Sequence, residues 1–224
     1  HSYENPEHER RTREIVEEVH PDAYVTLSHE LTKEYREYER TNTTVLNSYV
    51  RPIADEYLDT LAGQLGDRGF AGNTYAMKSN AGTASFAEAR RRPVEMVESG
   101  PVGGVYGAAH VGRQLDEPDV VSFDMGGTTA KTSVVRDGEV TIDTDYWLES
   151  SPRDEGYPLK IPVVDIVEIG AGGGSIAWVD QGGSINVGPK SSGADPGPAC
   201  YGRGGTEPTV TDANLLTGRL NPDY

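Results

Sequence analysis

The sequence predicts an α/β fold, and three observations carry this prediction. From Thr74 onward, short stretches rich in β-branched residues alternate with stretches of helical periodicity. Asp-Gly and Gly-Gly pairs separate several of these stretches, as turns between strands do. A chain of 224 residues with 35% hydrophobic residues is long enough to bury a core, and its single cysteine leaves no disulfide framework. We therefore expect a mixed sheet with helices.

The opening segment is polar and predicts little sheet structure. Residues 5–22 place arginine four positions before glutamate, as in Arg13 and Glu17, which indicates a charged helix that ends at Pro21. Residues 23–31 predict a strand followed by a loop.

A long amphipathic helix follows. Apolar residues recur at steps of three and four, at Leu46, Val50, Ile53, Tyr57, Leu61 and Leu65. Gly66 marks its end, and Pro52 must either kink the helix or lie in its first turn. The composition changes between the opening segment and the remaining chain near residues 40–47.

The α/β part is predicted element by element. Its strands are expected at residues 74–79, 95–98 and 120–124, a glycine-rich turn and helix at 99–115, and a hairpin at 132–143. In that hairpin Asp137-Gly138 supplies the positive φ angles of a type I′ turn. Arg90, Arg91 and Arg92 are expected in the last turn of a helix, where cations complement the carbonyl dipoles.

The charge excludes some classes of partner. The sequence has 36 acidic and 20 basic residues, a formal net charge of −16, which opposes binding to nucleic acid and to anionic membranes. No apolar run reaches the length of a membrane span or of a signal-peptide core. We expect a protein of the cytoplasm.

The stretch FDMGGTTAK, residues 123–131, carries the main chemical signal. A strand that ends in an acid and turns through two glycines exposes backbone N–H groups unobstructed by β-carbons, which suits a phosphate. Asp124 would hold Mg²⁺, directly or through water, and act in catalysis. The candidate ligands of the ATP phosphates are Gly126, Gly127, Thr128, Thr129 and Lys131.

Such a hairpin is typical of the actin, sugar-kinase and heat-shock-chaperone superfamily, which predicts an actin-like ATPase (ribonuclease H-like) fold. The alternative is a tight hairpin whose glycines satisfy geometry alone, with Asp124 capping the turn. Neither a Walker A sequence nor a Rossmann fingerprint after a strand is present, so the two commonest nucleotide folds have no support.

A second glycine cluster follows a predicted strand at residues 162–169. It is either another backbone cradle for phosphate or adenosine, or a place where the chain approaches a neighbouring element closely. The candidate binding residues are Gly172, Gly173, Gly174 and Ser175. Asp165, on the strand, is a candidate carboxylate that binds metal or activates water, and Glu168 is expected to face solvent.

Cysteine and histidine chemistry is not expected. No histidine lies near Cys200 in the sequence, so this residue is interpreted as a small buried thiol. The five histidines show no pair with zinc-ligand spacing and are expected on the surface.

Four stretches closely resemble the hydantoinase A/5-oxoprolinase family, which includes subunits of acetone and acetophenone carboxylases. They are residues 99–108, 123–131, 168–180 and 187–222. The resemblance implies an actin-like ATPase and ATP-driven chemistry. Some family members carry Asp where this chain has Lys131, so residue roles in the oxoprolinases do not transfer directly.

Family members are much longer than this chain, so the resemblance implies an internal, incomplete fragment that is inactive alone. Residues 1–45 would close the N-terminal domain, and residues 46–224 would form a truncated hydantoinase A/oxoprolinase domain. Asp124 to Thr129 would be the second of two phosphate hairpins.

The function that the resemblance implies is ATP-dependent hydrolysis of a cyclic amide, such as hydantoin, N-methylhydantoin or 5-oxoproline, through a phosphorylated intermediate. The expected cofactors are ATP and Mg²⁺ or another divalent cation, and the expected partner is a hydantoinase B-type subunit in a hetero-oligomer. The alternatives are a carboxylase subunit that phosphorylates a ketone enol and bicarbonate, a sugar-kinase-like ATPase, and a non-catalytic assembly surface.

Overall fold

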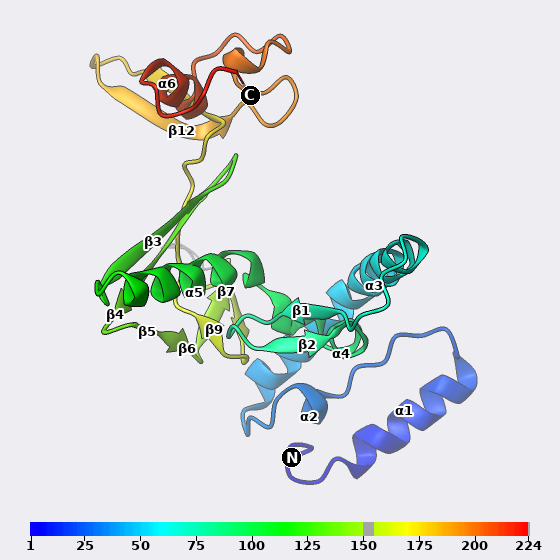
Figure 1. Cartoon of the computed structure of the whole chain (residues 1–224). Helices are drawn as coiled ribbons and strands as arrows, with labels where there is room; N and C mark the ends of the chain where they lie inside the picture. The colour runs from blue at the N-terminus through cyan, green and yellow to red at the C-terminus, as the bar shows by residue number, and fades with distance from the viewer. Residues whose placement is uncertain (150–154, 224) are drawn as a thin grey trace. The chain divides into compact units, whose positions relative to one another are not determined.

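A computed structural model describes residues 1–149 and 155–223 of the chain. The chain divides into two compact units that alternate along the sequence (Figure 1). Unit 1 comprises His1–Tyr106 and Thr141–Asp165, and unit 2 comprises Gly107–Val140 and Ile166–Tyr224. A helix runs through residues 45 and 46, where the sequence placed a domain boundary, and that boundary stays a prediction.

The helices of unit 1 begin with α1 (Glu7–Val19), α2 (Ser28–Leu31) and α3 (Glu37–Asp67). The predicted charged helix and long helix are confirmed, and Pro52 lies inside α3. The strand predicted in residues 23–31 is wrong, because that segment is extended without pairing and then forms α2. Arg13 pairs with Glu30 of α2, N–O 2.6 Å, and not along its own helix.

The buried side of α3 is more polar than its sequence pattern predicts. Ile53 is 72% exposed and Tyr57 64% exposed, although both belong to the predicted apolar stripe. Asn47 is fully buried, and its amide binds Thr26 Oγ1 at 3.2 Å and the Arg91 carbonyl at 3.1 Å. A buried amide is tolerated here because it satisfies backbone groups of the neighbouring segments.

Two predictions about residues 86–114 are wrong. After α4 (Phe86–Arg91), residues predicted as a strand form the 3-10 helix η1 (Pro93–Met96). The predicted glycine-rich turn is part of α5 (Ser99–Gln114), which begins before its glycines. Buried side chains at helical spacing, Val102 and Val105, hold these glycines in a helix despite their low propensity.

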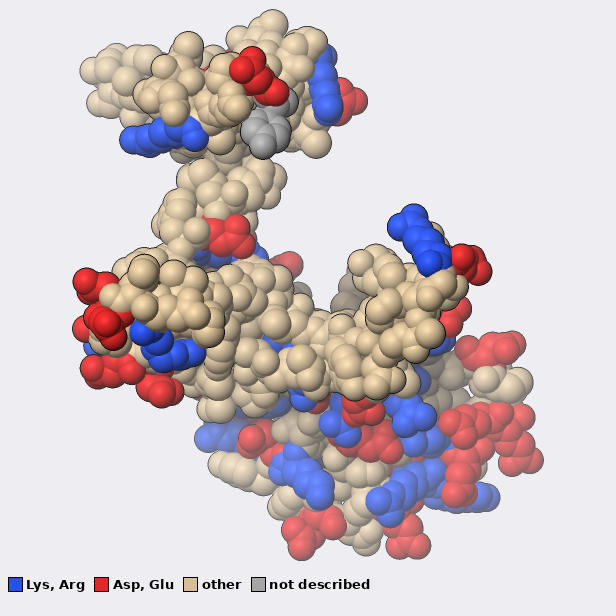
Figure 2. Space-filling view, in the orientation of Figure 1, with Lys and Arg blue, Asp and Glu red and all other residues tan. Residues whose placement is uncertain are grey.

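The described residues of unit 1 also form three two-stranded ladders. They are β1 (Tyr75–Met77) with β2 (Thr83–Ser85), β6 (Ile142–Asp143) with β9 (Val163–Val164), and β7 (Tyr146–Leu148) with β8 (Tyr157–Leu159). Its core contains two buried clusters, one of Val94, Leu159, Ile161 and Val163 and one of Leu58, Ala84 and Ala89. In the face shown in Figure 2, charged side chains of both signs gather over the helical part of this unit.

Unit 2 is built on β3 (Val120–Met125), β4 (Ala130–Arg136), β5 (Glu139–Val140) and β10 (Val167–Ile169). The strand order is β10-β4-β3, with β5 paired to β4. The predicted hairpin is confirmed, since Asp137 and Gly138 both have positive φ, 52° and 76°. Every strand pair in residues 1–149 and 155–223 is antiparallel, so the parallel pairing of a mixed sheet is not seen there.

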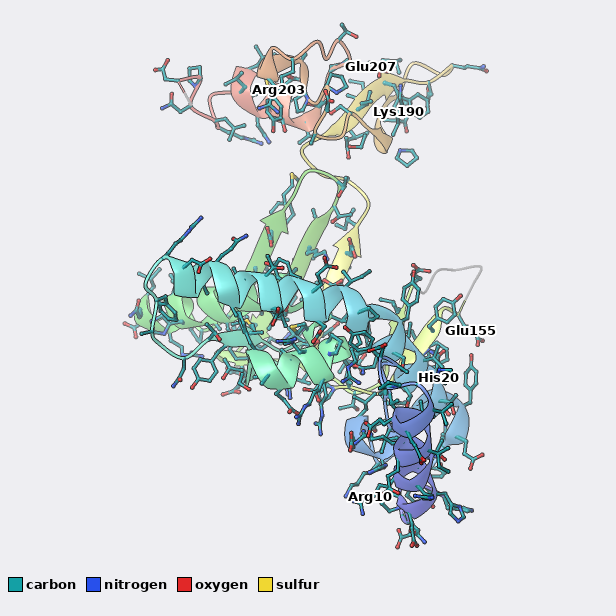
Figure 3. All side chains as sticks on the ribbon, turned by 90° about the vertical axis from the view of Figure 1, so that its right-hand side faces the viewer. Arg10, His20, Glu155, Lys190, Arg203 and Glu207 are labelled. Carbon is teal, nitrogen blue, oxygen red and sulfur yellow. The ribbon has the colours of Figure 1, made fainter. Side chains whose placement is uncertain are left out.

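The predicted strand at residues 162–169 is divided by the fold. Its first part is β9 in unit 1 and its last part is β10 in unit 2, because each part pairs with a different strand. The tail of unit 2 contains β11 (Ser175–Val179), β12 (Ile185–Ser191), η2 (Ala199–Tyr201) and α6 (Val210–Leu216). Lys190 of β12 pairs with Glu207 at 2.8 Å, and the two side chains lie side by side in Figure 3.

Candidate phosphate-binding site

The glycine hairpin joins β3 to β4 in unit 2. The N–H of Gly126 donates to the carbonyl of Thr129 at 2.9 Å and closes a four-residue turn. A β-carbon at Gly127 would meet no atom within 4 Å, so the tip has open space beside it. Within the described part of the chain, the N–H groups of Gly127, Thr128 and Thr129 have no acceptor. Three successive amides are thus available to an anion at the tip.

The second glycine cluster lies directly against this tip. Gly173 N–H donates to the Gly126 carbonyl at 2.9 Å, and Gly174 N–H donates to the Gly127 carbonyl at 2.7 Å. A β-carbon at Gly172 would lie 2.6 Å from the backbone nitrogen of Thr128. Of the two interpretations left open by the sequence, the geometry favours close approach. A direct contact of this cluster with nucleotide stays a prediction.

The tail of unit 2 supports the glycine cluster from its other side. Thr211 of α6 donates both its N–H and its hydroxyl to the Gly173 carbonyl, each at 2.9 Å. Ser175, 1% exposed, accepts the Gly172 N–H at 2.9 Å through its hydroxyl oxygen. Hydrogen bonds therefore connect α6 to the cluster and the cluster to the hairpin.

The charged candidates form a row across the sheet. Asp124 and Glu168 both face Lys131 as register partners, so the three side chains emerge on the same side of β3, β4 and β10. Lys131 Nζ lies 3.8 Å from Glu168 Oε2. Asp165 belongs to unit 1, where its N–H donates to the Thr141 carbonyl at 2.9 Å.

Asp124 fits a magnesium ion that is bound mainly by phosphate and water. No group of three or more metal-ligating side chains exists among the described residues. Mg²⁺ usually needs only one or two carboxylates together with substrate phosphates and water molecules. Asp124 is exposed and lies two residues before Gly126, so the residues present suit this mode of binding.

Cys200 differs from its prediction, because the thiol is exposed. A hydrogen bond to the carboxylate of Asp212 raises the pKa of the Cys200 thiol, and partial burial adds to this effect. A raised pKa disfavours the nucleophilic thiolate. His29 also differs, since its side chain is only 8% exposed and pairs with Glu9 at 2.7 Å.

Asp212 is a structural residue that the sequence reasoning missed. It forms a capping box with Thr209 at the start of α6 and also accepts the N–H of Cys200 at 2.7 Å. Partial burial acts to raise the pKa of Asp212, but hydrogen bonds from Cys200 and Thr209 outweigh it and lower the pKa to about 2. The spacing Thr-x-x-Asp before an apolar run was the available signal.

Replacing Asp212 with alanine is expected to destabilise the tail by roughly 1–2 kcal/mol at pH 7. The carboxylate's pKa is depressed in the folded state, so its stabilisation is present above the ordinary value of 3.8 and is lost as the pH falls toward about 2. Urea unfolding of both proteins between pH 7 and pH 2.5 measures this, with Asp223→Ala as an exposed control. A difference that stays constant over this range would contradict the charge-based explanation.

No helix in the described part of the chain is long and apolar enough to cross a membrane. The candidate phosphate hairpin lies in an α/β chain and is held in place by hydrogen bonds from a second glycine loop.

Comparison with known proteins identifies the family. The family model described as hydantoinase/oxoprolinase matches residues 40–224. The chain belongs to the hydantoinase/oxoprolinase family.

Two solved structures and one relative show how far the similarity extends. The ATP-dependent caprolactamase of Pseudomonas jessenii has a TM-score of 0.73 and 37% identity, covering 98% of this chain and 31% of that one. A nucleotide-free acetone carboxylase has a TM-score of 0.76 and 32% identity, covering 100% and 31%. An uncharacterized protein of Methanocaldococcus jannaschii is 43% identical over 98% of this chain and 33% of its own length.

These likenesses confirm the predicted family and the predicted α/β fold class of the actin-like ATPases. The chain spans about a third of the length of the Methanocaldococcus jannaschii protein and of caprolactamase subunit alpha, and 17% of the length of 5-oxoprolinase 1 of Arabidopsis thaliana.

Proposed function

We propose that this chain is part of an ATP-dependent enzyme subunit that opens a cyclic amide through a phosphorylated intermediate. The observation that carries the proposal is the hairpin tip, where three successive amides have no acceptor in the described residues and Gly127 stands beside open space. Backbone donors of this kind bind phosphate strongly in preorganised loops.

ATP would overcome the low reactivity of an amide toward water. Resonance stabilises the amide, so water attacks its carbonyl carbon slowly. Transfer of the γ-phosphoryl group to the carbonyl oxygen forms an O–P bond and releases ADP. Water then adds to the activated carbon, and the ring C–N bond breaks with a proton transferred to nitrogen, which leaves an acyl phosphate. A second water molecule hydrolyses the acyl phosphate and releases inorganic phosphate and the free carboxylate.

Some residues of the hairpin would donate hydrogen bonds to phosphate, and Gly126 would support the turn. The N–H groups of Gly127, Thr128 and Thr129, with the threonine hydroxyls, would bind the β- and γ-phosphates, and Lys131 would add positive charge. Gly126 would act through the turn, because its N–H already binds the Thr129 carbonyl. Mg²⁺ at Asp124 would offset charge that develops on the phosphates.

Two roles belong to residues outside the hairpin. Gly172, Gly173, Gly174 and Ser175 would hold the hairpin in position, as their hydrogen bonds and close contacts support. Asp165, which belongs to unit 1, stays a candidate general base on the ground of its sequence alone.

The substrate class has support from the names of relatives. Caprolactamase acts, by its name, on a lactam, which is a cyclic amide. The acetone carboxylase structure supports the second candidate, ATP-dependent carboxylation of a ketone. Relatives named as subunits, such as caprolactamase subunit alpha, support a hetero-oligomer, and we propose a hydantoinase B-type partner.

Substrate-dependent ATP hydrolysis by the full-length protein with its partner subunit tests the proposal. We expect phosphate release to rise at least tenfold with one of hydantoin, 5-oxoproline or caprolactam, and to remain at background with acetone plus bicarbonate. Stimulation only by the ketone would select the carboxylase. No Mg-ATP binding by calorimetry would favour a non-catalytic assembly role.

A further inference from the structure

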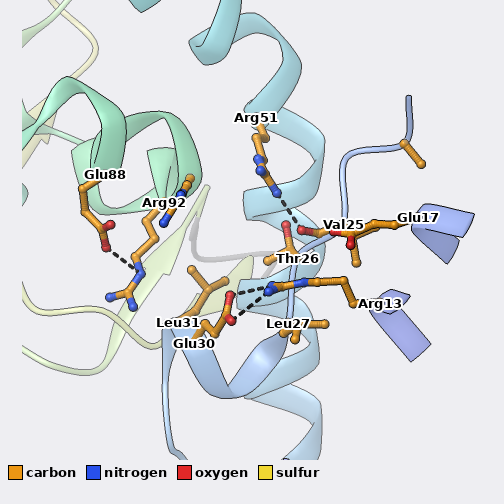
Figure 4. Close-up of a pocket in the computed structure, with 12 residues that line it drawn as sticks. Arg13, Glu17, Val25, Thr26, Leu27, Glu30, Leu31, Arg51, Glu88 and Arg92 are labelled. Atoms are coloured by element: carbon orange, nitrogen blue, oxygen red, sulfur yellow. Dashed lines mark hydrogen bonds and ion pairs between the residues drawn. The ribbon is translucent and has the colours of Figure 1, made fainter. Parts of the chain in front are cut away.

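Unit 1 contains a pocket that the proposed ATP chemistry does not use. Its volume is about 500 Å³, within the range of small-molecule sites. Figure 4 shows that the extended segment before α2 forms one wall, with side chains from the helices around it. Among the described residues that line the pocket, four are arginines, namely Arg13, Arg51, Arg91 and Arg92.

Two of these arginines are matched by glutamates. Arg13 binds Glu30 with its two terminal nitrogens, Nη1 and Nη2, at 3.0 and 2.6 Å, and Arg92 Nε lies 3.1 Å from Glu88 Oε1 (Figure 4). Bidentate pairing fixes the guanidinium of Arg13 in one orientation. These pairs leave little positive charge for a ligand.

The guanidinium group of Arg51 has one hydrogen-bond donor without an acceptor among the described residues. Its Nη1 donates to the Val25 carbonyl at 2.6 Å, and its guanidinium lies 5.4 Å from the ring centroid of Tyr24. Its Nε is buried and, among the described residues, has no hydrogen-bond acceptor. Asp55, one turn along α3, is already bound by Arg90 at 2.6 Å. Buried donors without an acceptor are rare in folded proteins, so this guanidinium is not satisfied by the protein alone.

Arg91 and Glu17 are the remaining charged residues that line the pocket. In residues 1–149 and 155–223 neither side chain forms an ion pair or hydrogen bond. Among the residues that line the pocket, four guanidinium groups face three carboxylates, those of Glu17, Glu30 and Glu88, while Glu95, outside the lining, also approaches Arg92 Nη1 at 3.5 Å. The lining itself thus has one more guanidinium than carboxylate, in a chain of formal charge −16, and suits a monoanion.

We infer that this pocket binds a small organic monocarboxylate. Its carboxylate is attracted by the guanidinium groups of Arg51 and Arg91, which suit a planar carboxylate. Its hydrocarbon part lies against the apolar lining of Val25, Leu27 and Leu31. A dianionic phosphate fits less well, because three glutamates line the same pocket.

Calorimetric titration of the purified protein with sodium pentanoate, at constant ionic strength, tests this inference. We expect saturable binding with one site, no binding of the uncharged pentanamide, and weaker heat from inorganic phosphate. Arg91→Gln should weaken pentanoate binding at least tenfold. Arg68→Gln is the matched control, because Arg68 is an exposed arginine at the end of α3 outside this pocket.

Folding is checked in each variant by circular dichroism and thermal unfolding without ligand. Arg91→Gln should fold normally, since its side chain has no described partner. Arg51→Lys keeps the charge but loses the planar donor set, and should weaken binding in a protein that still folds. Absence of saturable pentanoate binding, equal binding of pentanamide, or an unchanged affinity in Arg91→Gln would each overturn the inference.

Discussion

Gly172→Ala is expected to abolish most ATP turnover of the full-length enzyme. A β-carbon there would lie 2.6 Å from the nitrogen and carbonyl carbon of Thr128 and 2.7 Å from the carbonyl carbon of Gly127. These atoms are backbone and cannot rotate aside, so the hairpin tip must shift. Misplacement of phosphate donors by about 1 Å can lower the rate about 100-fold. Overpacking should also destabilise unit 2 by about 1–3 kcal/mol.

Gly170→Ala is the matched control for this prediction. It lies two residues earlier in the same cluster, and its β-carbon would meet no atom within 4 Å. Its stability should change by less than about 0.5 kcal/mol, and its turnover should stay near that of the unmodified enzyme. Initial rates of ADP release and urea unfolding measure both variants. Equal rates of ADP release in the two alanine variants would show that the close approach of Gly172 to Thr128 does not affect ATP turnover.

Asp124→Asn is expected to reduce ATP turnover about 100- to 1000-fold while the fold is retained. The amide has nearly the size of the carboxylate, so the loss would come from the missing charge beside the proposed magnesium position. Because the substitution weakens metal binding, higher Mg²⁺ concentration should restore part of the rate. Steady-state rates at several Mg²⁺ concentrations measure this effect.

Glu168→Gln controls for general removal of negative charge. Glu168 stands in the same row as Asp124, on the other side of Lys131. We expect at most a few-fold change, because its carboxylate is 3.8 Å from Lys131 and is not assigned to metal. Full activity in Asp124→Asn, or equal losses in both variants, would refute the metal role of Asp124.

Local signals were sufficient for several elements. The hairpin at Asp137-Gly138 was predictable because only a few residue types accept two successive positive φ angles. The helix that ends at Asp67 was predictable because its periodic pattern continues for many turns. Strand β3, which contains Asp124, was predictable because β-branched residues precede a glycine turn.

Other elements depended on contacts that the local sequence does not contain. The glycines of α5 look like a turn, but the burial of Val102 and Val105 keeps them helical. Residues 162–169 read as one strand, yet their two parts pair with strands of different units. Cys200 is exposed because its segment is held by Asp212 at the surface and does not enter the core.

The sequence by itself determined the family, the α/β class and the glycine turn after Asp124, because turn geometry and motif spacing are local properties. Only the tertiary structure decided what the second glycine cluster does. Its residues lie against the glycine hairpin between β3 and β4, through backbone hydrogen bonds between segments more than forty residues apart. Backbone groups are the same in every residue, so their pairing across the fold leaves no trace in the local sequence beyond the absence of side chains.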